Sequence, residues 1–328
     1  MKHGGDVWNA GKPSEWLDFS ANLRPEGPFP WIRNVISDAM ENVRYYPDPE
    51  MKRARKGMAA FLALPEECVL VTAGGIAAID LALTSSEGCV YTMPPAFSEY
   101  HYRAAIHGRP YGAWAGKCRK GDTLVVCNPN NPTGSILTRT ELLNLWSRLT
   151  ADRGELLIDE AFIEYSPGYS MRSCIRPGMI IAGSMSKILG TPGIRLGYLC
   201  AVPETIQILR SRMMPWPLDA FAEEVAAQLP AHMDEIRAEA GLNAGRRSAF
   251  AERLQETGGK VYPSESNFLL VDFCRGMYPI AAELKSRGIL VRTCSSFGLP
   301  DSVWRLAVKT EAENSRLVNV LEELLHAR

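Results

Sequence analysis

Short apolar runs rich in β-branched residues recur along much of the chain, and helix-length segments separate them. The runs lie at 69–72, 89–92, 123–127, 156–159, 179–183 and 196–201. Between them lie apolar repeats at helical spacing, as in Ile76, Ile79 and Leu83, and in Leu142, Leu145, Trp146 and Leu149. Strands that alternate with helices predict an α/β fold with a largely parallel sheet covered by helices on both faces.

The last third of the chain predicts a second, smaller α+β unit. A helix-rich stretch comes first, at about 204–257, with Pro230 and Gly241 as expected breaks or kinks. It is followed by expected strands at 267–272, 289–292 and 304–308, and by a final helix with the apolar stripe Leu317, Val320, Leu321, Leu324 and Leu325. Residues 1–30 contain several prolines and little periodicity, which predicts an ordered arm.

These patterns divide the chain into three parts. An N-terminal arm (1–30) is expected to join the small domain, a large domain spans 31–240, and the small C-terminal domain spans 241–328.

Composition excludes several classes of protein. The chain has 328 residues with 36 basic and 37 acidic side chains, a balance that gives no reason to expect nucleic acid or a membrane surface as a partner. The longest apolar stretches are strand-sized, far short of the roughly 20 residues that span a bilayer, and the N-terminus lacks the apolar segment of a signal peptide. The eight cysteines form no CxxC pair, and the five histidines show no metal-ligand spacing. We therefore expect a cytoplasmic protein with reduced cysteines and no metal site.

Two loops that follow predicted strands could bind parts of a phosphorylated ligand. In Thr72–Ala77, the amides of Gly74, Gly75 and Ile76 would lie at the start of a helix, a favourable place for a phosphate, although a plain tight turn explains the glycines equally well. Asn131 lies in the sequence Asn-Pro-Asn-Asn-Pro-Thr-Gly, where the two prolines and the glycine fix the loop. Its amide could then donate to a ring oxygen.

Two further motifs could bind the rest of such a ligand. Asp159 ends an apolar strand, where a carboxylate is costly unless a cation such as a protonated pyridine nitrogen accompanies it. The alternative is a carboxylate that caps the next turn. Lys187 follows Ser184 and Ser186 and precedes Arg195. This group could form an imine with an aldehyde and bind its phosphate.

The spacing of these motifs strengthens the hypothesis. Asn131 and Asp159 are 28 residues apart, and so are Asp159 and Lys187. Because this interval is about one strand and one helix, each motif should reach the same edge of the sheet, where ligands of open α/β sheets bind.

The motifs resemble those of the fold type I, class I/II aminotransferases, which depend on pyridoxal 5′-phosphate (PLP). The resemblance rests on Asn-Pro-x-Asn-Pro-Thr-Gly, Asp-Glu-Ala-Phe, Ser-x-Ser-Lys and Gly-Ile-Arg-Leu-Gly, and it continues in the C-terminal part at Ser266–Phe268 and Trp304–Val308. It implies a PLP transferase fold with a large PLP-binding domain.

The resemblance also implies roles for individual residues. Lys187 would form the imine with PLP, Asp159 would pair with the pyridine nitrogen, and Asn131 would bond the ring hydroxyl. The phosphate would contact Gly74, Gly75, Ile76, Ser184, Ser186 and Arg195. Phe97 would stack on the ring, and Arg305 would bind the substrate α-carboxylate. Tyr46 resembles the tyrosine that reaches the phosphate of the partner subunit, which implies a homodimer.

Within that family the chain looks closest to the threonine-phosphate decarboxylases of cobalamin synthesis. His3 in His-Gly-Gly, Asn22 in Asp-Phe-Ser-Ala-Asn and Phe162, where many aminotransferases have tyrosine, carry this resemblance. It implies decarboxylation of L-threonine O-3-phosphate, a phosphorylated amino acid, with His3 and Asn22 as substrate ligands. Arg24 interrupts the usual Asn-Pro sequence and is either a further phosphate ligand or an exposed side chain.

Two alternatives stay open. A histidinol-phosphate or related amino-acid aminotransferase would use the same fold and cofactor, and serine phosphate differs from threonine phosphate by only one methyl group. A non-catalytic PLP-binding regulator is less favoured, because such proteins usually carry a DNA-binding domain that the roughly 45 residues before the large domain cannot hold.

Overall fold

The computed structural model of the chain describes residues 4–8 and 12–326. Within them, a seven-stranded sheet with the order β2-β8-β7-β6-β5-β3-β4 forms the centre of the large domain. Its strands are β2 (Val69–Thr72), β3 (Val90–Thr92), β4 (Tyr111–Ala113), β5 (Thr123–Cys127), β6 (Glu155–Asp159), β7 (Met179–Ser184) and β8 (Gly197–Cys200). Only β8 runs antiparallel to its neighbours in this sheet. The predicted α/β fold with a mostly parallel sheet is confirmed.

Helices enclose this sheet. They are α1 (Pro30–Ala39), α2 (Lys52–Leu62), α3 (Gly75–Ala82), α4 (Glu99–Ile106), α5 (Arg139–Ala151), α6 (Pro203–Arg212) and α7 (Ala220–Gln228). Every residue of β2, β5, β7 and β8 is buried, as expected for strands that are covered on both faces. That burial explains why these strands appear in the sequence as continuous apolar runs rather than as alternating patterns.

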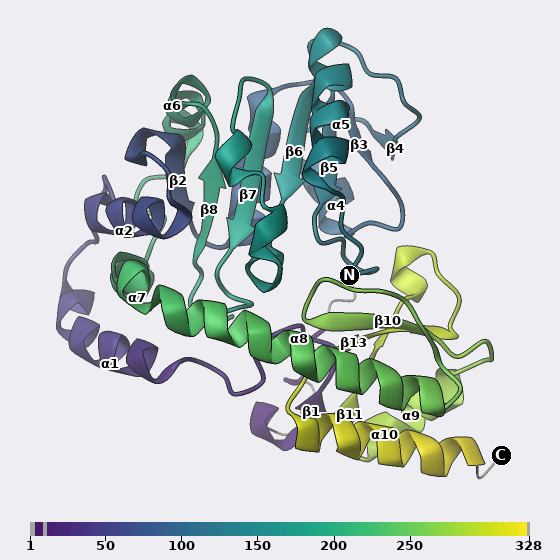
Figure 1. Cartoon of the computed structure of the whole chain (residues 1–328). Helices are drawn as coiled ribbons and strands as arrows, with labels where there is room; N and C mark the ends of the chain where they lie inside the picture. The colour runs from purple at the N-terminus through teal and green to yellow at the C-terminus, as the bar shows by residue number, and fades with distance from the viewer. Residues whose placement is uncertain (1–3, 9–11, 327–328) are drawn as a thin grey trace.

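The smaller domain packs beneath the large one (Figure 1). Its antiparallel sheet has the order β12-β13-β10-β9, with the strands β9 (Lys260–Val261), β10 (Phe268–Asp272), β12 (Arg292–Thr293) and β13 (Val303–Ala307). The helices α9 (Tyr278–Ser286) and α10 (Glu311–His326) belong to the same domain. A second apolar core, separate from that of the large domain, includes Phe250, Leu254, Trp304, Leu317 and Leu321.

Two segments connect the domains. The arm begins in the small domain, where β1 (Leu17–Asp18) pairs in parallel with β11 (Ile289–Leu290), and it crosses to the large domain before α1. The long helix α8 (Met233–Glu256) returns to the small domain and lies along the boundary between the two (Figure 1).

Two expectations for the C-terminal half need correction. Gly241 does not break a helix, because α8 continues through it; the cost of a helical glycine, about 1 kcal/mol, is offset by the burial of neighbours such as Ala240. The run 289–292 is not one strand, since β11 pairs with the arm and β12 with β13. The break at Pro230 is confirmed by a short 3₁₀ turn (Leu229–His232) between α7 and α8.

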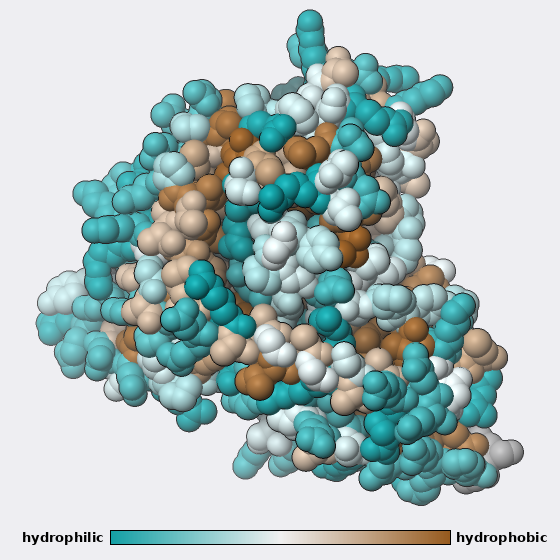
Figure 2. Space-filling model, in the orientation of Figure 1, coloured by the Kyte–Doolittle hydropathy of each residue, from teal (hydrophilic) through white to brown (hydrophobic). Residues whose placement is uncertain are grey.

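The surface is largely hydrophilic on the face shown in Figure 2, with hydrophobic side chains gathered in smaller patches. No helix within the described residues is long and apolar enough to cross a membrane.

Candidate functional site

The predicted site residues of the large domain meet at one edge of the sheet. The parallel strands β5, β6 and β7 end there, so the loops with Asn131, Asp159 and Lys187 emerge side by side. One pocket lies at this edge, and the residues that line it are Gly75, Ile76, Ile79, Phe97, Cys127, Asn131, Asp159, Ala161, Phe162, Ser184, Lys187 and Arg195. Because β8 runs in the opposite direction, its start brings Arg195 to the same edge.

Close backbone packing forms one end of the pocket. Gly74 has φ of +91°, and a Cβ atom built on it would lie 2.5 Å from Nη2 of Arg195. A Cβ atom on Gly75 would lie 2.9 Å from Cβ of Ser184. The two glycines therefore let the start of α3 approach both side chains. Ser186 is fully buried, and its hydroxyl has no hydrogen-bond partner among the described residues. This end of the pocket combines helix N–H groups, hydroxyls and a guanidinium, which suits a phosphate.

Lys187 is held in surroundings that favour the neutral amine. Burial lowers its pKa to about 8, and the positive charges of Arg195 and Arg305 contribute to this shift, while Asp159 opposes it. Its Nζ atom lies 6.0 Å from the ring centroid of Phe162. A neutral amine is the form that attacks an aldehyde, so the site prepares Lys187 for imine formation near neutral pH.

Asp159 is a buried carboxylate with two donors. The hydroxyl of Tyr100 donates to Oδ2 at 2.6 Å, and the backbone N–H of Ala161 donates to Oδ1 at 2.9 Å. Burial raises the pKa of Asp159, whereas the hydrogen bond from Tyr100 lowers it. A carboxylate in this position is suited to pair with a cationic ring nitrogen.

Arg305 reaches the pocket from the small domain. It lies on β13, and its guanidinium donates to Oδ1 of Asn131 at 2.6 Å and to the carbonyl of Ser20 at 2.7 Å. Its Nε–H is buried and has no hydrogen-bond partner within the part of the chain that the structure describes. Burial lowers the pKa of Arg305 to about 10, and the nearby charge of Arg292 also lowers it. Arg305 thus joins both domains and the arm at one point.

The three residues that carry the resemblance to the decarboxylases are placed as follows. Asn22 is buried, and neither polar atom of its side-chain amide has a hydrogen-bond partner among residues 4–8 and 12–326. Phe162 is buried and makes an edge contact with Phe268, with ring centroids 5.1 Å apart. His3 lies outside the described residues.

Tyr46 lies away from the pocket of its own chain. It is 85% exposed, and its ring lies 5.2 Å from that of Trp216. Other large apolar side chains nearby in sequence, Met40, Val43 and Tyr45, are also exposed.

Arg24 is not an exposed side chain, whereas its role as a phosphate ligand stays a prediction. Its side chain is only 12% exposed and forms an ion pair of 2.8 Å with Glu239 of α8. Because Glu239 is buried, its carboxylate needs a cationic partner, and Arg24 provides one. The sequence could not show this pairing because the two residues are 215 positions apart.

Two residues of the site escaped the sequence analysis. Tyr100 contacts Asp159, and its only signal was its position three residues after Phe97, in the first turn of a helix. Arg292 lies directly opposite Arg305 in the β12–β13 pair. A charged residue at the end of the apolar run 289–292 could have indicated it.

The arrangement fits PLP. The amine of Lys187 can bond its aldehyde, Asp159 faces the pocket as a partner for the ring nitrogen, and Phe97 lines it as an aromatic surface. Ser184 and Arg195 line the end of the pocket beside the start of α3, where a phosphate could bind.

Comparisons with known proteins agree with this fit. The family model "Aminotransferase class I and II" matches residues 14–321. A histidinol-phosphate aminotransferase of Symbiobacterium thermophilum is 31% identical, over 94% of this chain and 90% of that protein. A threonine-phosphate decarboxylase of Salmonella typhimurium is 27% identical, over 98% and 96%.

A solved structure supports the same assignment. The histidinol-phosphate aminotransferase of Clostridium acetobutylicum superposes with a TM-score of 0.86 at 25% identity, covering 94% of this chain and 99% of that chain. The family model covers nearly the whole sequence, from the arm to α10. The chain therefore belongs to the aminotransferase class I and II family and is an enzyme that depends on PLP.

Proposed function

We propose that this enzyme decarboxylates L-threonine O-3-phosphate to (R)-1-amino-2-propanol O-2-phosphate, the linker of the cobalamin nucleotide loop. The relatives include both threonine-phosphate decarboxylases and histidinol-phosphate aminotransferases, so similarity alone does not select the reaction. The observation that carries the proposal is the pairing of Arg292 with Arg305, whose guanidinium donates to the pocket residue Asn131.

Two adjacent arginines suit a substrate with two anionic groups. Directly opposed residues of an antiparallel pair have Cα atoms about 4.5–5.5 Å apart and side chains on the same face. The charge of Arg292 lowers the pKa of Arg305, which supports the proximity of the two guanidinium groups. L-Threonine O-3-phosphate carries its carboxylate and its phosphate on neighbouring carbons, whereas histidinol phosphate has a phosphate and no carboxylate.

In this proposal the residues of the large domain hold the cofactor. Lys187 bonds its aldehyde, Asp159 pairs with the ring nitrogen, Asn131 bonds the ring hydroxyl, and Phe97 stacks on the ring. The phosphate is bound by Gly74, Gly75, Ile76, Ser184, Ser186 and Arg195. PLP, when bound, withdraws electrons from the substrate Cα.

The substrate contacts then determine which bond at Cα breaks. Arg305, helped by Asn22, would bind and orient the α-carboxylate, while His3 and Arg292 would bind the phosphate. The carboxylate leaves as carbon dioxide, and its electron pair stays on Cα. Lys187, with a pKa of about 8 that is set mainly by burial, returns a proton to Cα.

The test is an incubation of the PLP-loaded enzyme with L-threonine O-3-phosphate, with release of carbon dioxide and product mass as readouts. We expect carbon dioxide and amino-propanol phosphate in equal amounts, with no keto acid. Turnover of histidinol phosphate that depends on 2-oxoglutarate, without carbon dioxide from threonine phosphate, would establish the aminotransferase instead. The 31% identity to such an enzyme makes this the second candidate.

We further propose that the enzyme is a homodimer in which Tyr46 reaches the phosphate of the partner's cofactor. The exposed apolar surface formed by Met40, Val43, Tyr45 and Tyr46 supports this arrangement, because large side chains of this kind are enriched at interfaces. Sedimentation of the wild type and of Tyr46→Phe tests it. We expect a dimer in both cases, with weaker PLP binding in the variant.

A further inference from the structure

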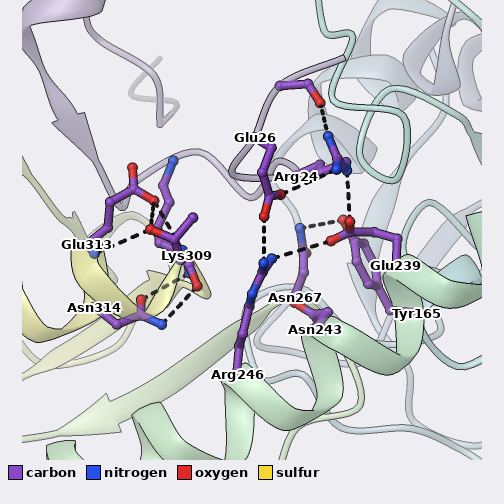
Figure 3. A network of polar contacts seen from close by, with 12 residues as sticks. Arg24, Glu26, Tyr165, Glu239, Asn243, Arg246, Asn267, Lys309, Glu313 and Asn314 are labelled. Atoms are coloured by element: carbon purple, nitrogen blue, oxygen red, sulfur yellow. Dashed lines mark hydrogen bonds and ion pairs between the residues drawn. The ribbon is translucent and has the colours of Figure 1, made fainter. Parts of the chain in front are cut away.

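Four charged side chains close a ring where the two domain connections meet (Figure 3). Arg24 and Glu26 belong to the arm, and Glu239 and Arg246 lie on α8. The ion pairs are Arg24 to Glu239 at 2.8 Å, Glu239 to Arg246 at 3.8 Å, Arg246 to Glu26 at 2.5 Å, and Glu26 to Arg24 at 3.6 Å. We call these four residues the charge cluster. Its two positive and two negative charges balance.

The charge cluster is built into the protein rather than lying on its surface. The Glu239 side chain is 2% exposed and that of Arg24 is 12% exposed. Arg24 also donates to the carbonyl of Gly27 at 2.7 Å and lies over the ring of Phe29, 4.2 Å from its centroid. Burial raises the pKa of Glu239, while the hydrogen bond from Arg24 lowers it. Removal of either partner would leave the other with only its longer ion pair, of Glu239 with Arg246 at 3.8 Å or of Arg24 with Glu26 at 3.6 Å.

The backbone of Arg24 connects the charge cluster to the catalytic lysine. Its N–H donates to the carbonyl of Lys187 at 3.1 Å. The same carbonyl accepts a hydrogen bond of 3.1 Å from the hydroxyl of Tyr165, which in turn accepts from the amide of Asn267 at 3.2 Å. The arm, the large domain and the small domain therefore all contribute to holding the main chain of Lys187.

The same stretch of arm carries the substrate contacts. Asn22, two residues before Arg24, has a buried amide that finds no hydrogen-bond partner in the described part of the chain. Ser20, two residues earlier, accepts a hydrogen bond from Arg305 through its carbonyl at 2.7 Å. A shift of the arm at Arg24 would move both groups relative to Lys187.

We propose that Arg24 and Glu239 are positioning residues that hold the arm between Lys187 and Arg305, so that the substrate's anionic groups meet Asn22 and Arg305 in the correct geometry. This inference rests on the proposed roles of Asn22 and Arg305 as substrate ligands. Arg24 acts through the arm and does not touch the substrate. The alternative is a cluster that only stabilises the fold.

The experiment compares Arg24→Met, Glu239→Gln and the double variant as PLP-loaded enzymes. KM and kcat are measured with L-threonine O-3-phosphate and separately with L-glutamate, both of which carry an α-carboxylate. We expect each single change to raise KM by about tenfold, equivalent to about 1.4 kcal/mol, with kcat within about threefold of the wild type. The double variant should be no worse than the poorer single one, because the two residues act as one pair.

Arg287→Met is the matched control. Arg287 also contacts two glutamates, Glu283 and Glu323, but on the surface of the small domain, so its KM should stay unchanged. If KM is unchanged in both Arg24→Met and Glu239→Gln, or if kcat falls as KM stays constant, the positioning role is wrong. Should Arg24→Met fail to fold, the nearly isosteric Glu239→Gln decides the question by the same measurements.

Measurements with both L-threonine O-3-phosphate and L-glutamate distinguish a failure of this inference from a failure of the proposed reaction. A wild-type enzyme that transaminates L-glutamate and does not decarboxylate threonine phosphate overturns the proposed function alone. The charge cluster is then judged by the KM for L-glutamate in the same variants.

Discussion

Tyr100→Phe tests how the protein controls the proton at the cofactor's ring nitrogen. The substitution removes one hydroxyl, which donates to Oδ2 of Asp159 at 2.6 Å in a buried setting. The ring remains and can keep its edge contact with Phe97, where the centroids are 5.7 Å apart. The hydrogen bond from Ala161 to the other oxygen is also retained.

The size of the effect follows from the strength of this bond. A hydrogen bond to a charged group contributes about 1.5–3 kcal/mol. Since the bond from Tyr100 lowers the pKa of Asp159, its loss should raise that pKa. Asp159 would then take a larger share of the proton from the ring nitrogen. If half of this hydrogen-bond free energy is lost from the stabilisation of the transition state, kcat falls about four- to twelvefold.

The assay is nitrogen NMR of the enzyme reconstituted with PLP labelled at the ring nitrogen, combined with steady-state kinetics. We expect the nitrogen signal to move toward that of a neutral pyridine, together with the lower kcat. Tyr91→Phe is the control, because Tyr91 has a comparable edge contact with Trp114, at 5.7 Å, and does not bond Asp159. An unchanged nitrogen signal and kcat in Tyr100→Phe would refute the reasoning.

Three further predictions concern the remaining site residues. The rate at which PLP recombines with the apoenzyme should rise with pH up to about 8 and then level off. The reason is that burial lowers the pKa of Lys187 to about 8 and only the neutral amine attacks. A recombination rate that continued to rise past pH 10 in stopped-flow absorbance would contradict this. Arg305→Gln should raise KM for the amino acid by about a hundredfold or more, since it leaves the substrate's buried carboxylate without its charged partner. The PLP dissociation constant should stay within about threefold of the wild-type value. An unchanged KM would exclude Arg305 as the carboxylate ligand. Gly74→Ala should weaken PLP binding at least tenfold, because a Cβ atom at φ of +91° would lie 2.5 Å from the guanidinium of Arg195. The control is Gly241→Ala on α8, where a Cβ atom would meet open space, and this variant should bind PLP normally.

The sequence by itself determined the fold class and the side of the sheet on which the chemistry occurs. The apolar runs are visible because strands covered on both faces must be apolar throughout. The intervals of 28 residues between Asn131, Asp159 and Lys187 follow from one strand and one helix per repeat. In parallel strands such repeats necessarily return to the same edge, so local patterns were sufficient.

Only the tertiary structure decided which residues support that site from a distance. Arg292 and Arg305 become neighbours through strand pairing, and Arg24 meets Glu239 because the arm crosses α8 between the domains. Tyr100 reaches Asp159 only when α4 packs against the end of β6. Such contacts depend on how elements far apart in the chain pack together, and no local pattern of polar and apolar residues records that packing. The sequence therefore indicates the proposed cofactor site, and the packing of the arm and the small domain against it underlies the proposed substrate contacts.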